Sequence, residues 1–197
     1  MAFAVLKRGQ MSVTSRTGEV LERGLTRLDA LIGQALLAVH LEAGLKAEPR
    51  RTRMTTLLHQ LEESAILERD VTLSVEVDDE ELEIDADERL LNTALSNILQ
   101  NGLKFSRAGG HVILRGRAED GTAVIEVEDE CGGLPPGRIE EMFAPFVQVG
   151  DDRRGLGLGL SVTREAVHAH GAELLVRNLP GKGCVFAVRL RKSPPMS

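Results

Sequence analysis

The stretch Asn97-Ile98-Leu99-Gln100-Asn101-Gly102-Leu103-Lys104-Phe105-Ser106 ends a segment, 88–106, whose pattern predicts one long helix. Apolar or small residues recur at the helical spacing i, i+4, i+7, i+11, i+14, and these are Leu91, Leu95, Ile98, Gly102 and Phe105. A second stripe, roughly 110° around the helix from the first, carries Asn97, Asn101 and Lys104. Two amides and one ammonium group are therefore expected together at the border of the buried face.

The chemistry of this polar stripe suits a magnesium-bound phosphate ligand. An amide oxygen is a hard ligand of the kind that Mg²⁺ accepts. An ammonium group binds phosphate as a point charge. The alternative is a solvated helix face that happens to carry asparagines.

Composition restricts the classes of function. The chain has 197 residues, a net charge of −6, no Trp or Tyr and only short basic pairs, which disfavours nucleic acid as the main partner. Its two cysteines provide no disulfide framework and are consistent with a reducing cytosol, so we expect a cytoplasmic protein. The sequence has no apolar run of the roughly 20 residues that a membrane helix needs and no signal-peptide pattern at its start.

The first 45 residues predict a helical dimerisation segment. Apolar residues alternate steps of four and three along 19–41, and these are Leu21, Leu25, Leu28, Ile32, Ala35 and Val39. Such a seam is typical of a coiled coil or helix bundle, and one helix cannot bury it alone. We therefore expect a homodimer through residues 1–45, with an exposed apolar face as the alternative. The polar stretch 46–53 is expected to be a linker, and 192–197 a tail.

Residues 54–191 predict one α+β domain. Alternating apolar residues indicate strands at 71–77, 82–84, 111–117, 122–128, 173–177 and 184–190. Helical spacing indicates helices at 54–67, 88–106, 138–142 and 159–170. Hairpins outnumber crossovers, so we expect a two-layer sandwich in which helices cover one face of a mixed, mostly antiparallel sheet.

Two glycine-rich stretches lie at the ends of expected elements. Asp129-Glu130-Cys131-Gly132-Gly133 follows a strand, and its carboxylate is placed to accept from an exocyclic amine such as that of adenine. Gly155-Leu156-Gly157-Leu158-Gly159 opens a helix, where free backbone N–H groups favour phosphate. An ordinary Asp-Gly turn and a plain glycine-rich loop are the respective alternatives.

The order Asn-x-x-x-Asn-x-x-Lys, Asp-x-x-Gly-Gly, Gly-x-Gly-x-Gly closely resembles the ATP-binding domain of sensor histidine kinases. That domain belongs to a superfamily shared with gyrase, the mismatch-repair clamp and heat-shock chaperone ATPases. Met142-Phe143-Ala144-Pro145-Phe146 resembles the family's phenylalanine box, and Gly183-Cys184-Val185-Phe186 its last glycine motif. The resemblance covers about 54–191, and extends loosely to 21–44 as part of the kinase dimerisation hairpin.

The resemblance implies a role for each matching residue, with ATP and Mg²⁺ as cofactors. Asn101 would ligate Mg²⁺ with Asn97 beside it, Lys104 would contact phosphate, and Asp129 would accept from adenine. The remaining nucleotide-binding positions would be Cys131, Gly133, Phe146, Arg153, Arg154, Gly155, Leu156, Gly157, Leu158 and Gly159. Residues 147–156 would be the mobile lid, from which Arg153 or Arg154 could reach the γ-phosphate.

Two positions depart from the family's pattern. Cys131 stands where the first glycine of Asp-x-Gly-x-Gly usually lies, and Gly102 replaces the usual alanine after the second Asn. Both residues are small, so the pocket is expected to survive. Cys131 is interpreted as a quiet buried thiol, with oxidation sensitivity as the alternative.

The residue one helical turn before Asn101, the Mg²⁺ ligand that the resemblance implies, indicates the reaction. Hydrolytic members of the superfamily have a glutamate where this chain has Asn97, and an amide cannot act as a base. We therefore expect transfer of a phosphoryl group to a presented nucleophile, with Asn97 and Lys104 as the catalytic residues. The resemblance implies that the chain is part of a protein-histidine kinase whose partner is the receiver domain of a response regulator. The acceptor-histidine motif is absent, so the chain is expected not to autophosphorylate alone and to be a fragment or an acceptor-less form. A non-catalytic ATP-binding or dimerisation module and an ATPase clamp are the alternatives, and an anti-sigma serine kinase is a weaker relative.

Overall fold

The computed structural model describes residues 47–67, 70–135, 137–147 and 157–193 of the chain. The expected dimerisation segment, 1–45, lies outside these residues. The described elements follow in the order β1 (Arg50–Arg53), α3 (Met54–Ser64), β2 (Thr72–Val77), β3 (Glu83–Ala86), α4 (Glu88–Phe105), β4 (His111–Glu119), β5 (Thr122–Asp129), the 3₁₀ turn η1 (Glu140–Phe143), α5 (Gly159–Ala169), β6 (Glu173–Leu179) and β7 (Gly183–Arg191).

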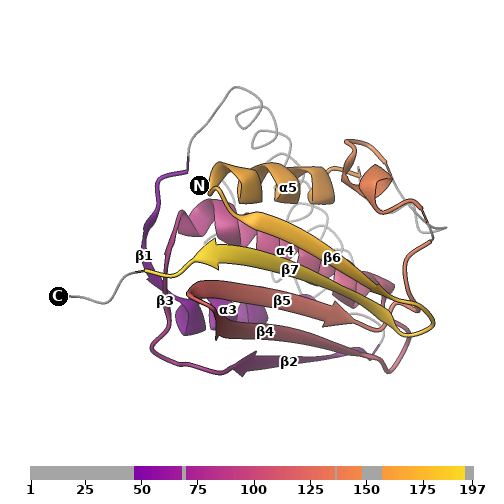
Figure 1. The fold of residues 1–197 in the computed structure, drawn as a ribbon. Helices are drawn as coiled ribbons and strands as arrows, with labels where there is room; N and C mark the ends of the chain where they lie inside the picture. Colours follow the sequence, from indigo (N-terminus) through magenta and orange to yellow (C-terminus); the bar gives the residue numbers. More distant parts are fainter. Residues whose placement is uncertain (1–46, 68–69, 136, 148–156, 194–197) are drawn as a thin grey trace, which may run out of the picture. The chain divides into compact units, whose positions relative to one another are not determined.

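The main sheet has five strands in the order β2-β4-β5-β7-β6 (Figure 1). The edge pair β2–β4 is parallel and the other three pairs are antiparallel. The β4–β5 hairpin closes through Asp120 and Gly121, which have φ values of +47° and +78°. Positive φ at both central residues is what a two-residue hairpin turn needs, and Asp-Gly tolerates it best. The expected mixed, mostly antiparallel sheet is confirmed.

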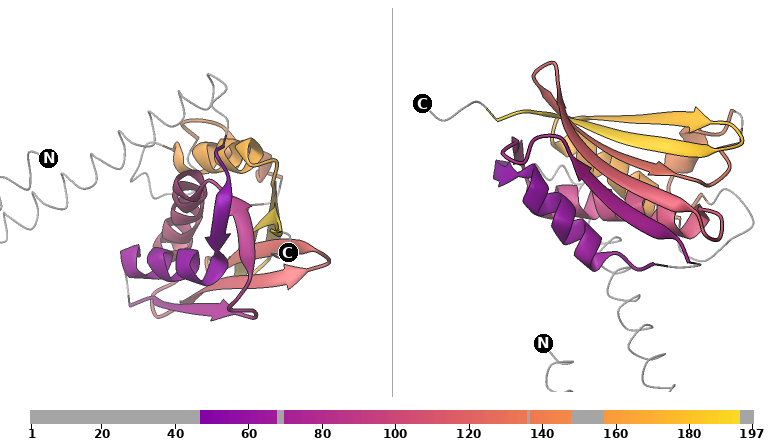
Figure 2. Two further views of the ribbon diagram at one scale, coloured as in Figure 1. Left: turned by 90° about the vertical axis from the view of Figure 1, so that its left-hand side faces the viewer. Right: turned by 90° about the horizontal axis from the view of Figure 1, so that it is seen from below.

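Helices α3, α4 and α5 all pack on one face of this sheet (Figure 2). Successive strand residues point to opposite faces, so on β5 Ala123, Ile125 and Val127 enter the core beneath the helices. Helix α4 packs against α3, α5 and the sheet together, and it buries residues around a wide arc, including Leu90, Leu99 and Leu103. Its predicted apolar stripe is wrong at one position, because the Phe105 side chain is 39% exposed at the last turn.

Part of the stretch that we expected to be a linker forms a strand of a second, two-stranded sheet. Strand β1 pairs antiparallel with β3, so residues 50–53 are part of the domain. The start of the expected tail is also attached, since the Ser193 hydroxyl donates to Asp85 Oδ1 at 2.6 Å. Within the described residues, no helix combines the length and the apolar character that crossing a membrane requires.

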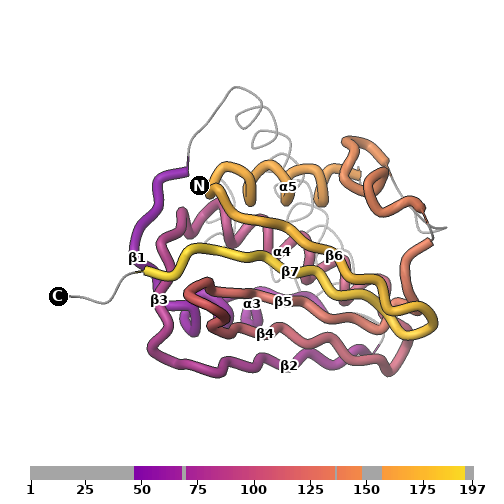
Figure 3. The backbone as a smooth tube through the Cα atoms, in the orientation of Figure 1, coloured from indigo at the N-terminus to yellow at the C-terminus, as the bar shows by residue number. Residues whose placement is uncertain are grey.

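Four chain segments meet at one end of the domain, on the right in Figure 3. They are the end of α4, the end of β5, the start of β7 and the start of α5. Helix α4 begins at the opposite end, where the Asp87 carboxylate caps it by accepting from the Leu90 N–H at 3.3 Å. The predicted polar stripe and both glycine stretches belong to these four segments or directly adjoin them.

Candidate functional site

Asp129 lies at the centre of the end where the four segments meet. It is the last residue of β5 and is paired across the ladder with Cys184 at the start of β7. Its side chain is buried, with the residue only 6% exposed. The Oδ1 atom accepts from the backbone N–H groups of Cys131 at 3.0 Å and Cys184 at 3.1 Å. These two backbone donors hold the carboxyl group in its buried position and fix its orientation.

Glycines allow the backbone to approach Asp129 from two sides. A Cβ added at Gly102 would lie 3.4 Å from the Asp129 Cβ, so helix α4 passes directly beside this carboxylate. Because that distance is ordinary contact, the alanine usual in the family would also fit at this position. A Cβ at Gly183 would overlap the Asp129 carbonyl oxygen, so only glycine permits the β5–β7 ladder at this point.

Asn97 connects the polar stripe of α4 to the glycine turn before α5. Its Nδ2 atom donates to the Gly159 carbonyl oxygen at 3.1 Å, and the residue is buried. The same carbonyl accepts from the Thr163 hydroxyl at 2.9 Å, which also lies 3.2 Å from the Ala94 carbonyl. The structure therefore brings Asn97 and Gly159 together, and Thr163 is a buried positioning residue that sequence reasoning missed.

Asn101 and Lys104 follow Asn97 on the same helix, at the spacing that the sequence predicted. Both residues are half-buried, in the last turns of α4. The Lys104 Nζ atom lies 4.7 Å from the centre of the Phe105 ring, which is close enough for a cation–π contact. One helix thus carries a buried amide, a half-buried amide and a half-buried ammonium group in sequence toward its end.

Gly157 packs against the backbone that precedes the expected lid. Its φ is +69°, and an added Cβ would lie 2.8 Å from the Val147 carbonyl oxygen. The Phe146 N–H donates to the Gly157 carbonyl at 2.9 Å, so this hydrogen bond joins the residues on either side of the expected lid. Phe146 is 72% exposed, and Leu158 is buried before the first turn of α5. Four predicted nucleotide-binding residues, Arg153, Arg154, Gly155 and Leu156, lie outside the described residues.

The loop after β5 is held by a side chain that sequence reasoning missed. The Asn178 Oδ1 atom accepts from the Leu134 N–H at 2.8 Å, and its Nδ2 donates to the Leu134 carbonyl at 3.0 Å. Gly133 has a φ of +102°, and an added Cβ would lie 3.1 Å from Asn178 Oδ1. Asn178 stands forty-four residues away in the chain, so no local pattern reveals this contact.

Both cysteines lie beside Asp129. The Cys184 Sγ atom is 3.0 Å from Asp129 Oδ2 and 3.8 Å from the Cys131 Sγ atom. The hydrogen bond shared with Cys131, burial and the nearby carboxylate together raise the pKa of the Cys184 thiol well above its ordinary value. Cys131 is only half-buried, and the hydrogen bond with Cys184 lowers the pKa of its thiol, so its interpretation as a quiet buried thiol stays a prediction. Its proximity to Cys184 was not anticipated.

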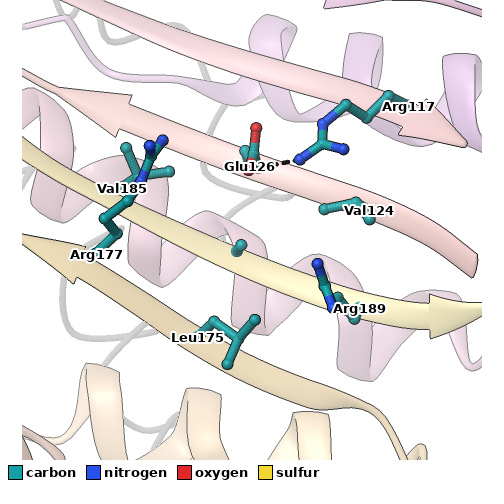
Figure 4. Close-up of a pocket in the computed structure, with 8 residues that line it drawn as sticks. Arg117, Val124, Glu126, Leu175, Arg177, Val185 and Arg189 are labelled. Atoms are coloured by element: carbon teal, nitrogen blue, oxygen red, sulfur yellow. Dashed lines mark hydrogen bonds and ion pairs between the residues drawn. The ribbon is translucent and has the colours of Figure 1, made fainter. Parts of the chain in front are cut away.

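A hollow of about 220 Å³ lies elsewhere, on the sheet face away from the helices (Figure 4). Its lining alternates with the core residues along each strand, which places it on the other side of the sheet from Asp129. Its walls are Arg117, Val124, Glu126, Leu175, Arg177, Val185, Ala187 and Arg189. None of the predicted site residues contributes to this hollow.

His170 has a structural role near the far end of α4. Its Nε2 atom accepts from the Asp87 N–H at 3.0 Å, and its Nδ1 lies 2.7 Å from the Ala166 carbonyl oxygen. These contacts use both ring nitrogens and tie the end of α5 to the start of α4.

Comparison with known proteins supports the resemblance seen in the motifs. The family model for histidine kinase-, DNA gyrase B- and HSP90-like ATPases matches residues 86–194. The alginate biosynthesis sensor protein KinB of Pseudomonas aeruginosa is 32% identical over 198 residues, covering 96% of this chain and 33% of KinB. The chain therefore spans about a third of the length of this relative.

Two solved structures have the same fold. The mycobacterial sensor histidine kinase MprB aligns with a TM-score of 0.66 and 27% identity, covering 75% of this chain and 99% of that one. Full-length ShkA in complex with AMPPNP aligns with a TM-score of 0.77 and 25% identity, covering 92% of this chain and 39% of that one. Because the family model spans more than half of the sequence, this chain belongs to the histidine kinase-, DNA gyrase B- and HSP90-like ATPases and carries an ATP-binding domain of the sensor histidine kinase type.

Proposed function

We propose that this chain binds ATP with Mg²⁺ and supplies the phosphoryl-transfer part of a two-component sensor histidine kinase. The observation that carries the proposal is the grouping of Asp129, Gly102 and the Asn97–Gly159 contact at one end of the domain. The kinase relatives, among them a nucleotide-bound ShkA, support the same function.

In this proposal Asp129 recognises the adenine. Its Oδ1 atom accepts from two backbone N–H groups. Its Oδ2 atom lies 3.0 Å from the Cys184 thiol, which is its hydrogen-bond partner in the described part of the chain. A thiol is a weak donor, so the exocyclic amine of adenine can replace it. Guanine carries a carbonyl at that position and would face the carboxylate with an acceptor.

The polar stripe of α4 would hold the phosphates. The Asn101 amide oxygen fits Mg²⁺, which would bridge phosphate oxygens and neutralise the developing charge. Lys104 would contact phosphate, and backbone N–H groups at the start of α5 would add donors. Asn97 holds the Gly159 carbonyl through its amide, and it provides no base for activating water. This residue favours transfer to a presented nucleophile over hydrolysis.

The site residues Cys131, Gly133, Phe146, Gly157 and Leu158 would line or shape the nucleotide pocket, with Arg153, Arg154, Gly155 and Leu156 in the lid. We further propose a cytoplasmic homodimer joined through residues 1–45, with a response-regulator receiver domain as the partner that takes the phosphoryl group. The seam predicted for residues 19–41 and the sensor-kinase relatives support this assembly.

The test has two steps. Titration calorimetry should give binding of MgATP and at least tenfold weaker binding of MgGTP. Radiolabelled ATP should then label a separately added kinase hairpin that carries an acceptor histidine, with the acid-labile bond of phosphohistidine, and should leave this chain unlabelled. Repeated ATP turnover without the acceptor would instead indicate an ATPase clamp, and failure to bind MgATP would indicate a non-catalytic module.

A further inference from the structure

Three potential metal ligands lie together beneath the proposed adenine position. They are one carboxylate oxygen of Asp129 and the sulfurs of Cys131 and Cys184, and all lie within 4.8 Å of one another. The chain contains no other cysteine, so both of its thiols are in this cluster. Asp129 and Cys184 are buried, and Cys131 is half-buried, which gives an ion a route from solvent.

The spacing of the donors fits a tetrahedral ion. Two sulfurs bound to one Zn²⁺ at about 2.3 Å lie about 3.8 Å apart when the geometry is tetrahedral. The Cys131 and Cys184 sulfurs are 3.8 Å apart. The Asp129 Oδ2 atom is 3.0 Å from the Cys184 sulfur, so the side chain needs to open by only about 0.5 Å to share a metal at about 2.0 Å.

The charge beside the Cys184 thiol favours a cation over a reactive thiolate. Reactive cysteines lie next to positive groups that stabilise the thiolate. Here the nearest charged oxygen is a carboxylate 3.0 Å from the Cys184 sulfur, which opposes ionisation of the free thiol. A soft divalent ion reverses this balance, because it binds both thiolates and the carboxylate together.

We propose that Asp129, Cys131 and Cys184 form a binding site for a thiophilic divalent cation of the Zn²⁺ class, and that this cation excludes adenine from Asp129. Binding releases one proton from each thiol and leaves the carboxylate as the third ligand, with a fourth position open to water. The metal uses the Oδ2 atom that adenine would use, so the two ligands compete. The competition rests on the proposed function, whereas metal binding itself does not.

Metal binding is tested first, on reduced protein without nucleotide or affinity tag. Cd²⁺ should release two protons per ion and produce an ultraviolet thiolate-to-metal charge-transfer band that saturates at one ion per chain. Zn²⁺ should then abolish the band by displacing Cd²⁺, without further release of protons. Cys131→Gly and Cys184→Thr should each weaken Cd²⁺ binding at least tenfold. His59→Ala, which removes an exposed imidazole far from the cluster in sequence, is the matched control and should bind Cd²⁺ like the wild type.

Competition is tested with two nucleotides, because their phosphates chelate metal equally. At one fixed free Cd²⁺ concentration, excess MgATP should reduce the band at least tenfold more effectively than MgGTP. Absence of the band, or an undiminished band in both cysteine variants, would overturn the metal site. Equal effects of MgATP and MgGTP would overturn the competition.

Metal binding and nucleotide binding can fail independently of each other. If MgATP binds in the presence of a chelator but Cd²⁺ gives no band, the proposed function stands and the metal site fails. If Cd²⁺ binds but MgATP does not, the metal site stands and the proposed function fails. If hydrogen peroxide oxidises both thiols to a disulfide and weakens MgATP binding while Cd²⁺ gives no band, the cluster is a redox switch and the metal proposal is wrong.

Discussion

Two buried aspartates lie near opposite ends of helix α4, and they distribute their hydrogen bonds differently. Asp87 accepts from the Leu90 N–H with Oδ1 at 3.3 Å and from the Glu48 N–H with Oδ2 at 3.1 Å. Asp129 takes both of its backbone N–H donors on Oδ1 and leaves Oδ2 to a thiol. The Asp87 carboxylate uses one oxygen to cap α4 and the other to hold the backbone before β1, whereas the Asp129 carboxylate keeps one oxygen that a ligand can take.

The residues around the two aspartates also differ. Around Asp87, side chains tie elements together, as His170 does between α5 and α4. Around Asp129, Gly102 and Gly183 bring backbone close and add no side-chain atoms. One end of α4 is therefore organised for stability, and we propose that the other is organised for binding.

The largest expected effect is on Gly183, whose substitution disrupts the Asp129 end. Gly183→Ala places a Cβ onto the Asp129 carbonyl oxygen and forces the β5–β7 ladder apart. We expect a loss of about 3 kcal/mol or more in the free energy of unfolding, measured by urea denaturation. Gly181→Ala is the control, because its position has open space and only a positive φ of +77° to strain, at a cost of about 1 kcal/mol. Equal losses would contradict the close approach.

Replacing the aspartates by asparagine should separate binding from stability. Asp129→Asn removes the charged acceptor, and we expect MgATP affinity to fall about 10- to 100-fold, since a hydrogen bond to a charged group contributes about 1.5–3 kcal/mol. Asp87→Asn should change that affinity by less than about threefold. Titration calorimetry measures the MgATP affinity of both variants. Similar losses of affinity in the two would contradict the proposed difference between the two ends of α4.

The Asp87 end should respond to acid. Burial raises the pKa of the Asp87 carboxyl, but the N–H groups of Glu48 and Leu90 outweigh it and hold that pKa below its ordinary value. A depressed pKa means that the carboxylate stabilises the fold fully above the unfolded value of about 3.9. That stabilisation is lost as the pH falls below about 4 and through the folded pKa.

Asp87→Ala should therefore lower the free energy of unfolding by about 0.5–2 kcal/mol at pH 7, the usual effect of losing a helix cap. The difference from wild type should shrink below about pH 4, where the native carboxyl becomes protonated. Urea midpoints measured between pH 3 and pH 7 check this. A difference that stays constant over that range would show that the charge of Asp87 does not contribute.

The smallest effect is expected on the open face of the sheet, away from both aspartates. Glu126 pairs with Arg117 at 3.0 Å and with Arg115 at 3.8 Å. These pairs border solvent, so Glu126→Gln should cost about 0.5 kcal/mol and the cost should fall at high salt. MgATP affinity should be unchanged. A loss of MgATP affinity in this variant would show that the hollow in Figure 4 affects nucleotide binding, and that binding does not depend on the Asp129 end alone.

Local patterns in the sequence predicted most of the fold. Alternation and helical spacing located the five strands of the main sheet and the helices α3, α4 and α5 to within a few residues. The turn between β4 and β5 suits its sequence, because few residue pairs other than ones like Asp120-Gly121 accept positive φ twice. Strand β1 was missed because Arg50–Arg53 is polar and forms a strand only by pairing with β3. Phe105 fits the apolar spacing, but the helix ends there and leaves its side chain partly exposed.

The candidate site was only partly predictable. Asn97, Gly102 and Asp129 belong to short motifs, and the structure brings their segments together at one end of the sheet. Asn178, Thr163 and Cys184 act on residues 44, 69 and 55 positions away, respectively. Contacts at such separations depend on strand register and helix packing, which no single stretch of sequence contains.

The hydrogen bond between Phe146 and Gly157 has a consequence for how this domain can vary. It fixes the two points where the intervening segment leaves and rejoins the fold, so residues inserted there do not change the distance that the chain must span. Doubling the length of a loop with fixed ends costs only about 0.6 kcal/mol in closure entropy. As long as this hydrogen bond is kept, lengthening the chain between Phe146 and Gly157 should therefore cost the domain little stability.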